Sequence, residues 1–313
     1  MNKHFKKYFF YFVARILDLI GRYDDSIAFY SIVIHIRTFF WDAQERFERA
    51  YQRSSKKCYL EIFGGVGDLL QHLPFILRNK SAHYIVATHF KGAPAFFKSL
   101  NIKVDQYYFY AKKEEYREIR NLLKQNKNSY ICPRALFFKA PPFVTPRSLK
   151  NTKRKVMGVH PGASALGNHK AIPVSFTKKL IGFLNQEGYK VILFGTKKEL
   201  SEIQVLKNKD IIFASDTNII KNLSLVECCD LFIGSDSVFK TMASMLKLPT
   251  IVLHQDHKNN FRDRVFIKPY VNSHIMHVYK YTNFNEVEMK YALQFISNVM
   301  KSEINSLVGS DAP

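Results

Sequence analysis

The sequence YLEIFGGVGDLLQHLPFIL, residues 59–77, decides the fold of this chain. Its first five residues have the pattern of a buried strand, GGVG at 64–67 that of a tight turn, and the rest repeats apolar side chains with helical spacing. Such strand-to-helix turns lie at the carboxyl edge of open α/β sheets, where ligands bind. We therefore expect Asp68, at the start of the helix, to be a catalytic carboxylate or simply the residue that caps the helix.

Strands and helices alternate on both sides of a basic, proline-containing segment at 139–155, and this alternation predicts two parallel sheets. The first half has strand patterns at 59–63, 84–90, 104–110 and 129–132. The second half has strand patterns at 156–160, 189–195, 211–215, 231–235 and 250–255. We therefore predict an α/β chain with a helical appendage at 1–54, Rossmann-like domains at 55–145 and 146–280, and a closing helix and tail at 281–313.

The chain is strongly basic, with 47 Lys and Arg residues against 26 Asp and Glu and a formal net charge of +21. This charge fits a polyanionic partner such as nucleic acid, anionic lipid headgroups or phosphorylated sugars, although a general lysine-rich bias would give the same balance. No sequence motif of an RNA- or DNA-binding module is present, so we expect no nucleic acid partner. The four cysteines lack metal-ligand spacing, which indicates a reduced protein of the cytoplasm.

The first twenty residues predict an amphipathic helix rich in aromatic residues. Its apolar positions recur among basic residues at helical spacing: Phe5, Phe9, Phe12, Ile16, Leu19 and Ile20. Such a helix either lies on an anionic membrane surface or packs its apolar face on the rest of the protein. No apolar run is long enough to span a membrane, so we expect a cytoplasmic protein, with a peripheral position on the inner membrane as the alternative to a free one.

Four motifs follow one another along the chain: GVGDLLQHLP at 65–74, VHPGAS at 159–164 with KAIP at 170–173, LFG at 193–195 with Glu199, and NLSLVECCDLFIGSDS at 222–237. In order and spacing they resemble glycosyltransferase family 9, the heptosyltransferases of lipopolysaccharide core synthesis. The resemblance covers about residues 58–255 and leaves the first 54 residues without a counterpart. It implies the GT-B fold, in which two Rossmann-like domains with parallel sheets face each other across a cleft and the C-terminal domain binds a nucleotide sugar.

The resemblance implies an inverting glycosyltransferase that moves a sugar, heptose in this family, from a nucleotide diphosphate to a lipid-linked or phosphorylated glycan. Asp68 would be the general base, across the cleft from the nucleotide. Lys170 would stabilise the departing diphosphate as the second catalytic residue. The remaining donor-binding residues would be Ser164, Glu199, Asp236, Ser237 and Lys240. Glu199 would accept hydrogen bonds from the ribose or be a solvated helix residue, and Lys240 would add charge at a helix start or be solvated surface.

The acceptor-binding residues are expected near Asp68 and comprise Gly67, His72, Lys91 and Arg134. His72 lies four residues after Asp68 on the same helix face, so it either orients Asp68 or has a structural role. Lys91 and Arg134 are candidates for binding an anionic glycolipid or glycan. No Asp-x-Asp motif occurs, which agrees with a metal-independent reaction that uses no cofactor besides the nucleotide-sugar substrate.

The fourth motif departs from the family pattern just after Asp236. Val238 stands where the family has Gly, and Thr241 where it has His. These two positions favour an alternative of another class, a catalytically inactive nucleotide-sugar or glycan-binding protein that acts through its N-terminal helices. A nucleotide-sugar epimerase is a third function compatible with the same architecture.

Overall fold

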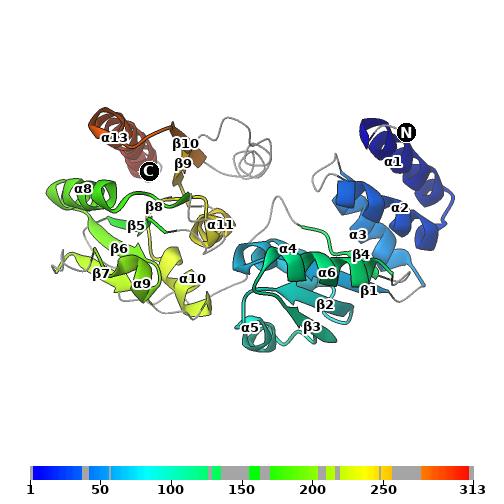
Figure 1. Cartoon of the computed structure of the whole chain (residues 1–313). Coiled ribbons are helices and arrows are strands. Elements are labelled where there is room, and N and C mark those ends of the chain that lie inside the picture. The colour runs from blue at the N-terminus through cyan, green and yellow to red at the C-terminus, as the bar shows by residue number, and fades with distance from the viewer. Residues whose placement is uncertain are drawn as a thin grey trace. The chain divides into compact units, whose positions relative to one another are not determined.

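The computed structural model describes residues 3–36, 42–55, 58–125, 129–134, 155–162, 170–203, 209–215, 219–246, 248–255 and 276–309. The chain divides into two compact units, Met1–Phe138 and Lys139–Pro313 (Figure 1). The linker predicted at 139–155 lies outside the described residues except for its last position.

The first unit is built on a parallel sheet of four strands: β1 (Tyr59–Phe63), β2 (His83–Thr88), β3 (Gln106–Phe109) and β4 (Ser129–Ile131). The strands lie in the order β3-β2-β1-β4. From β1 the sheet is extended on one side by β2 and β3 and on the other side by β4, so the strand order reverses at β1, which is the topological switch point of the sheet. The helices that follow β1, β2 and β3 are α4 (Val66–Arg78), α5 (Ala93–Ser99) and α6 (Lys113–Lys124). Because ligands bind at such a switch point in open α/β sheets, the turn after β1 is where a site is expected.

Local sequence explains the turn after β1. Four of the five β1 residues are buried, as in a parallel strand that is covered on both faces. Gly64 follows with a φ of 123°, a backbone conformation that residues other than glycine rarely adopt. A Cβ atom on Gly64 would lie only 2.2 Å from Asp68 Oδ2. Glycine at this position therefore allows the Asp68 carboxylate to fold back over the turn.

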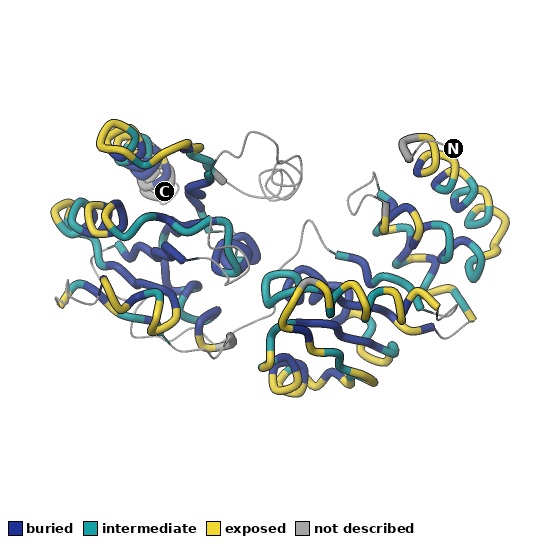
Figure 2. Tube along the Cα trace, viewed as in Figure 1, coloured by how far each residue is buried: buried dark blue, intermediate teal, exposed yellow. Residues whose placement is uncertain are grey.

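Three helices precede this sheet in the same unit: α1 (Lys3–Leu19), α2 (Tyr23–Ile36) and α3 (Ala43–Arg53). Helix α1 packs on α2, and α2 packs on α3 and β4. The predicted helical character of the N-terminal segment is therefore confirmed. Figure 2 shows buried residues along α2 and α3, whereas α1 has an exposed side along its length.

The second unit contains a parallel sheet of six strands: β5 (Val156–His160), β6 (Lys190–Phe194), β7 (Ile211–Ala214), β8 (Leu231–Gly234), β9 (Thr250–Gln255) and β10 (Met276–Tyr281). Its order, β10-β9-β8-β5-β6-β7, is the Rossmann order read from the far edge. The five predicted strands are confirmed, and β10 is a sixth that the sequence patterns missed. The switch point lies between β5 and β8.

The helices of the second unit are α8 (Val174–Gln186), α9 (Lys197–Leu200), α10 (Ile219–Glu227), α11 (Val238–Met245) and α13 (Glu286–Gly309). Helix α9 is a single turn that ends at Leu200. Buried side chains of α8, α13 and the inner strands form one continuous core, in which Leu180, Leu193 and Ile296 are fully buried. Within the described residues, no helix is both long enough and apolar enough to cross a membrane.

Candidate active site

The Asp68 carboxylate has two partners at the carboxyl edge of the first sheet. Its Oδ2 atom accepts a hydrogen bond from the backbone N–H of Gly65 at 3.0 Å. Its Oδ1 atom lies 3.0 Å from Arg134 Nη1, and the side chain remains 36% exposed. Asp68 therefore does cap α4 through one oxygen, while its second oxygen forms an ion pair and the carboxylate stays accessible. The two expectations for Asp68 are compatible in this geometry.

Arg134 reaches Asp68 from the end of β4. Its guanidinium also lies 3.4 Å from both Gln71 Oε1 and the Phe63 carbonyl oxygen, and only 16% of its side chain is exposed. Contacts to the end of β1 and to the next turn of α4 thus hold the guanidinium in place. Of the predicted acceptor-binding residues, Arg134 is the one that contacts Asp68 directly.

His72 is buried behind this pair. Its Nδ1 atom lies 2.9 Å from the carbonyl oxygen of Pro133, the residue before Arg134. Burial, with a smaller contribution from the Arg134 charge, lowers the pKa of His72 to about 3. The ring is therefore neutral, and its Nδ1–H donates to Pro133. This contact supports the segment that carries Arg134.

The other two predicted acceptor residues lie on either side of the same edge. Gly67 is in the first turn of α4 and is half-buried, while Lys91 is exposed in the turn after β2. Their positions are compatible with contact to a ligand at this edge, and their role stays a prediction.

Two residues that sequence reasoning missed complete this edge. His89 follows β2, and a Cβ atom on Gly65 would lie 2.7 Å from its Cε1 atom. The His89 and Tyr110 rings meet edge to face, with centroids 5.7 Å apart. Burial lowers the pKa of His89, and the nearby Asp68 charge partly opposes this shift. Burial raises the pKa of Tyr110, and the Asp68 charge raises it further. Both residues directly follow parallel strands, a position that could have identified them.

In the second unit, Asp236 binds two lysines at the carboxyl edge of the sheet. Lys170 Nζ lies 2.8 Å from Asp236 Oδ2, and Lys240 Nζ pairs with Oδ1. Burial alone would raise the pKa of Asp236, yet the Lys240 and Lys170 ammonium groups together hold it well below its usual range. Lys240 is only 3% exposed, so the interpretation of Lys240 as solvated surface is wrong. Lys170, at 28%, is the more accessible of the two cations.

The switch point of the second sheet is closed by contacts between the loops after β5 and β8. His160 Nδ1 lies 2.8 Å from the hydroxyl oxygen of Ser237, the residue that precedes α11. The Ser235 hydroxyl donates to the carbonyl oxygen of Gly162. His160 is buried, and this burial lowers its pKa to about 3, so the ring is neutral. These contacts fix the start of α11 against the end of β5.

Glu199 lies beside this switch point. Its Oε2 atom accepts from the backbone N–H of Thr196 at 2.7 Å, and the Thr196 hydroxyl accepts from the Glu199 N–H at 3.2 Å, which together form a capping box. A Cβ atom on Gly162 would lie 2.2 Å from Glu199 Oε1, so the carboxylate lies directly on the loop after β5. Glu199 is therefore half-buried and bound rather than a freely solvated helix residue.

The remaining predictions for the donor side have mixed outcomes. Ser164 lies outside the described residues. At the two positions that depart from the family pattern, Val238 is half-buried and Thr241 is 3% exposed, with its N–H directed to the Ser237 carbonyl oxygen at 3.3 Å. Across the described ranges, no three His, Cys, Asp or Glu side chains gather as a metal site would require.

Among comparisons with known proteins, a family model shows the family and solved structures show the fold. The model for "Glycosyltransferase family 9 (heptosyltransferase)" matches residues 97–295. The E. coli ADP-heptose lps heptosyltransferase II has a TM-score of 0.52 at 15% identity, over 79% of this chain and 99% of that one. A putative UDP-N-acetylglucosamine 2-epimerase from Listeria monocytogenes has a TM-score of 0.51 at 10% identity, over 80% of this chain and 90% of that one. No curated protein sequence matches the chain. The predicted GT-B fold is thereby confirmed.

Proposed function

Because the chain belongs to glycosyltransferase family 9, the heptosyltransferase family, we propose that it transfers a heptose from a nucleoside diphosphate to a lipid-linked or phosphorylated glycan. The product would belong to a cell-surface polysaccharide of the lipopolysaccharide type. The observation that carries the proposal is the Lys170–Asp236–Lys240 cluster at the switch point of a Rossmann-ordered sheet. Nucleotides bind at such switch points, and the cluster carries a net positive charge there.

The cluster suits a diphosphate for two reasons. Lys170 is the accessible cation, and Asp236 holds its ammonium group in a fixed position, so the charge needs little reorganisation when a phosphate arrives. Lys240 pairs with Asp236 from the buried side, so two ammonium groups surround one carboxylate and the cluster keeps a net positive charge. The N–H groups at the start of α11, next to Ser237, would add further donors. ADP-heptose is the first donor to test, because it appears in the name of the similar E. coli enzyme.

In the proposed reaction, an acceptor hydroxyl oxygen attacks the anomeric carbon of the donor sugar while Asp68 takes its proton. The bond between the anomeric carbon and the diphosphate oxygen breaks on the opposite face, and Lys170 meets the charge of the leaving diphosphate. A single displacement of this kind inverts the anomeric carbon. Arg134 would orient Asp68, because its guanidinium lies 3.0 Å from the carboxylate. Lys91 would bind an anionic group of the acceptor.

We further propose that the reaction uses no resident metal ion and takes place at the inner face of the membrane. The fixed ammonium group of Lys170 supports the first point, because it can do for the diphosphate what a divalent cation does in other transferases. A formal net charge of +21 supports the second, because the inner leaflet carries anionic lipids.

The test is turnover of a panel of ADP- and UDP-linked sugars, with release of nucleoside diphosphate and the mass of the glycan product as separate measurements. Sugar transfer from ADP-heptose, resistant to a chelator and with inversion at the anomeric carbon, is expected. Tight donor binding without transfer or hydrolysis would favour the binding-protein alternative instead. Interconversion of the sugar without transfer would favour an epimerase.

A further inference from the structure

Helix α1 presents a continuous apolar stripe to solvent. The outer face of α1 consists of Phe5, Phe9, Phe12, Ile16, Leu19 and the adjacent Ile20, whose side chains are between 47% and 77% exposed. At 3.6 residues per turn and 1.5 Å per residue, these positions fall within about 100° of the helix circumference and extend for about 22 Å. The interpretation in which this stripe packs on the rest of the protein is therefore wrong. Contiguous exposed apolar surface of this extent marks an interaction site.

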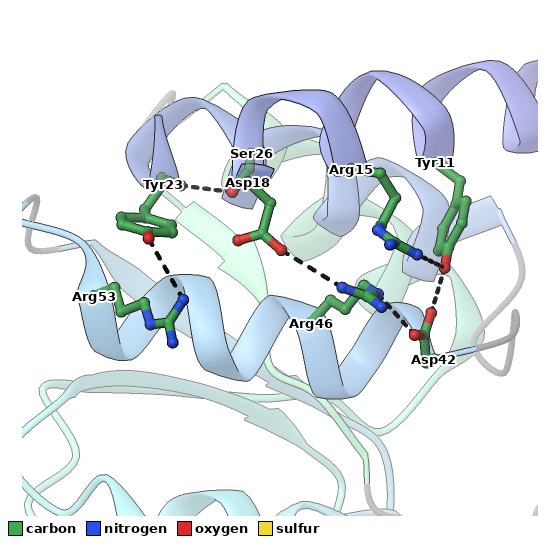
Figure 3. Close-up of polar contacts among 8 residues, drawn as sticks. All are labelled: Tyr11, Arg15, Asp18, Tyr23, Ser26, Asp42, Arg46 and Arg53. Atoms are coloured by element: carbon green, nitrogen blue, oxygen red, sulfur yellow. Dashed lines mark hydrogen bonds and ion pairs between the residues drawn. The ribbon is translucent and has the colours of Figure 1, made fainter. Parts of the chain in front are cut away.

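The opposite side of α1 is fixed by polar contacts to α3 and its N-cap (Figure 3). The Tyr11 hydroxyl donates to Asp42, and Arg46 Nε lies 2.7 Å from the other oxygen of the same carboxylate. Arg46 also lies 3.7 Å from Asp18, the only acidic residue of α1. Tyr11 and Ala14 are buried on this side. Because these contacts hold the helix from behind, the outer face cannot rotate inward without breaking them.

The charge around the outer face favours an anionic membrane over a second copy of the chain as its binding partner. Helix α1 contains four basic residues against one acid, but two of the four are not on the outer face: Lys7 is 5% exposed, and Arg15 bonds the Tyr11 hydroxyl on the inner side. The acid, Asp18, is also turned inward, to Arg46. Lys6 is exposed at the edge of the outer face. A second copy of the chain would carry the same net charge of +21 and repel the first, whereas anionic headgroups complement both Lys6 and this net charge. Phenylalanine on one face with lysine at its border is typical of helices that lie in the membrane interface.

We propose that the outer face of α1 is a docking surface for an anionic phospholipid bilayer, in which the helix lies parallel to the membrane plane. The inference deepens the proposed function, since it names the surface that would hold the enzyme at its lipid-linked acceptor. It stands on the geometry of α1, however, and its test measures binding rather than sugar transfer.

The test is co-sedimentation of the full chain with vesicles, either pure phosphatidylcholine or with about 30% phosphatidylglycerol, at low and high salt. Wild type is expected to bind the anionic vesicles, more weakly at high salt, and to bind the neutral ones poorly. The double variant Phe9→Ser with Phe12→Ser should lower the partition coefficient by at least about tenfold for each phenylalanine removed. Lys6→Glu should lower it by at least about fivefold on anionic vesicles alone.

The matched control is the double variant Val287→Ser with Tyr291→Ser, which removes comparably exposed apolar side chains from α13. It should bind vesicles like wild type. Circular dichroism melts should match for all variants, because every substituted side chain is exposed. Vesicle binding that is unaffected by the Phe9 and Phe12 changes, or absent in wild type, would overturn the proposal.

Two further outcomes separate this inference from others. Light scattering that shows a dimer in wild type and a monomer in the Phe9 and Phe12 variant would instead assign the face to a second copy of the chain. The Asp68→Asn variant should bind vesicles like wild type, and the Phe9 and Phe12 variant should retain transfer to a water-soluble acceptor. Failure of the docking surface and failure of the proposed reaction therefore give different results.

Discussion

Arg134 Nη1 lies 3.0 Å from Asp68 Oδ1, so the residue that follows β4 pairs with the carboxylate that follows the neighbouring strand β1. The pair links the two ends of the switch point in the first sheet. His72 supports the pair, because its ring hydrogen-bonds the carbonyl oxygen of Pro133, the residue before Arg134. An accessible carboxylate with a fixed orientation is what a general base requires.

Substitution of Asp68→Asn is expected to lower sugar transfer by roughly 10²- to 10⁴-fold, because the amide cannot take the proton of the acceptor hydroxyl. Donor affinity should change little, since the proposed donor-binding residues belong to the other unit. Turnover and calorimetry of ADP binding measure the two effects separately. The control is Glu114→Gln, which neutralises an exposed carboxylate on α6. Unchanged turnover in Asp68→Asn would remove Asp68 as the base.

Substitution of Lys170→Met should weaken ADP binding by about 10- to 100-fold, the effect of losing a charge-assisted hydrogen bond to phosphate. Binding of adenosine should not change, because adenosine has no phosphate. The fold should persist, since Lys240 still neutralises Asp236. Lys197→Met removes an exposed charge from nearby α9 and serves as the control. Equal losses for ADP and adenosine would contradict a phosphate contact and indicate a structural role for Lys170.

Substitution of Lys240→Met should lower the free energy of unfolding by about 3–5 kcal/mol, because it removes one partner of a buried ion pair. The matched control is Lys179→Met, which breaks the exposed pair with Glu286 on α13 and should cost less than about 1 kcal/mol. Urea unfolding of both variants at neutral pH measures the difference. Similar small losses would show that Lys240 is hydrated in solution.

The buried neutral His72 predicts a dependence of stability on pH. Its pKa falls from 6.5 in the unfolded chain to about 3 in the folded one. Between these values the unfolded chain binds the extra proton, so the contribution is fully present above pH 6.5 and is lost as pH falls. From about pH 7.5 to about pH 5 the loss from His72 should be about 2 kcal/mol.

His72→Asn provides the check, because its amide N–H can replace the Nδ1 donor to Pro133 and does not titrate. Urea unfolding at both pH values should show a smaller loss in this variant than in wild type. His160, whose pKa burial lowers to about 3 as well, is present in both proteins and should contribute equally. Identical pH dependence in the two proteins would mean that His72 is already protonated, or exposed, in the folded state.

Much of the fold follows from local patterns. The strand-turn-helix at 59–77 is found as predicted, because buried β1, Gly64 and the helical repeat after Asp68 each act within a few residues. Strand β10, MHVYKY, was missed although its alternation of apolar and polar residues is itself a strand pattern. It pairs in parallel with β9 along its whole length.

The sequence by itself determined the two parallel sheets and the place of Asp68 at the carboxyl edge of the first one, since these depend on periodicity and turn chemistry along the chain. The family resemblance rests on the order and spacing of four motifs. Only the tertiary structure decided which side chains pair with Asp68 and Asp236 and which way α1 faces. Arg134 lies 66 positions after Asp68, Lys170 lies 66 before Asp236, and α1 turns its apolar stripe outward because its other face is bound to α2 and α3. Contacts over such separations are set by the packing of whole elements, and no local pattern records them.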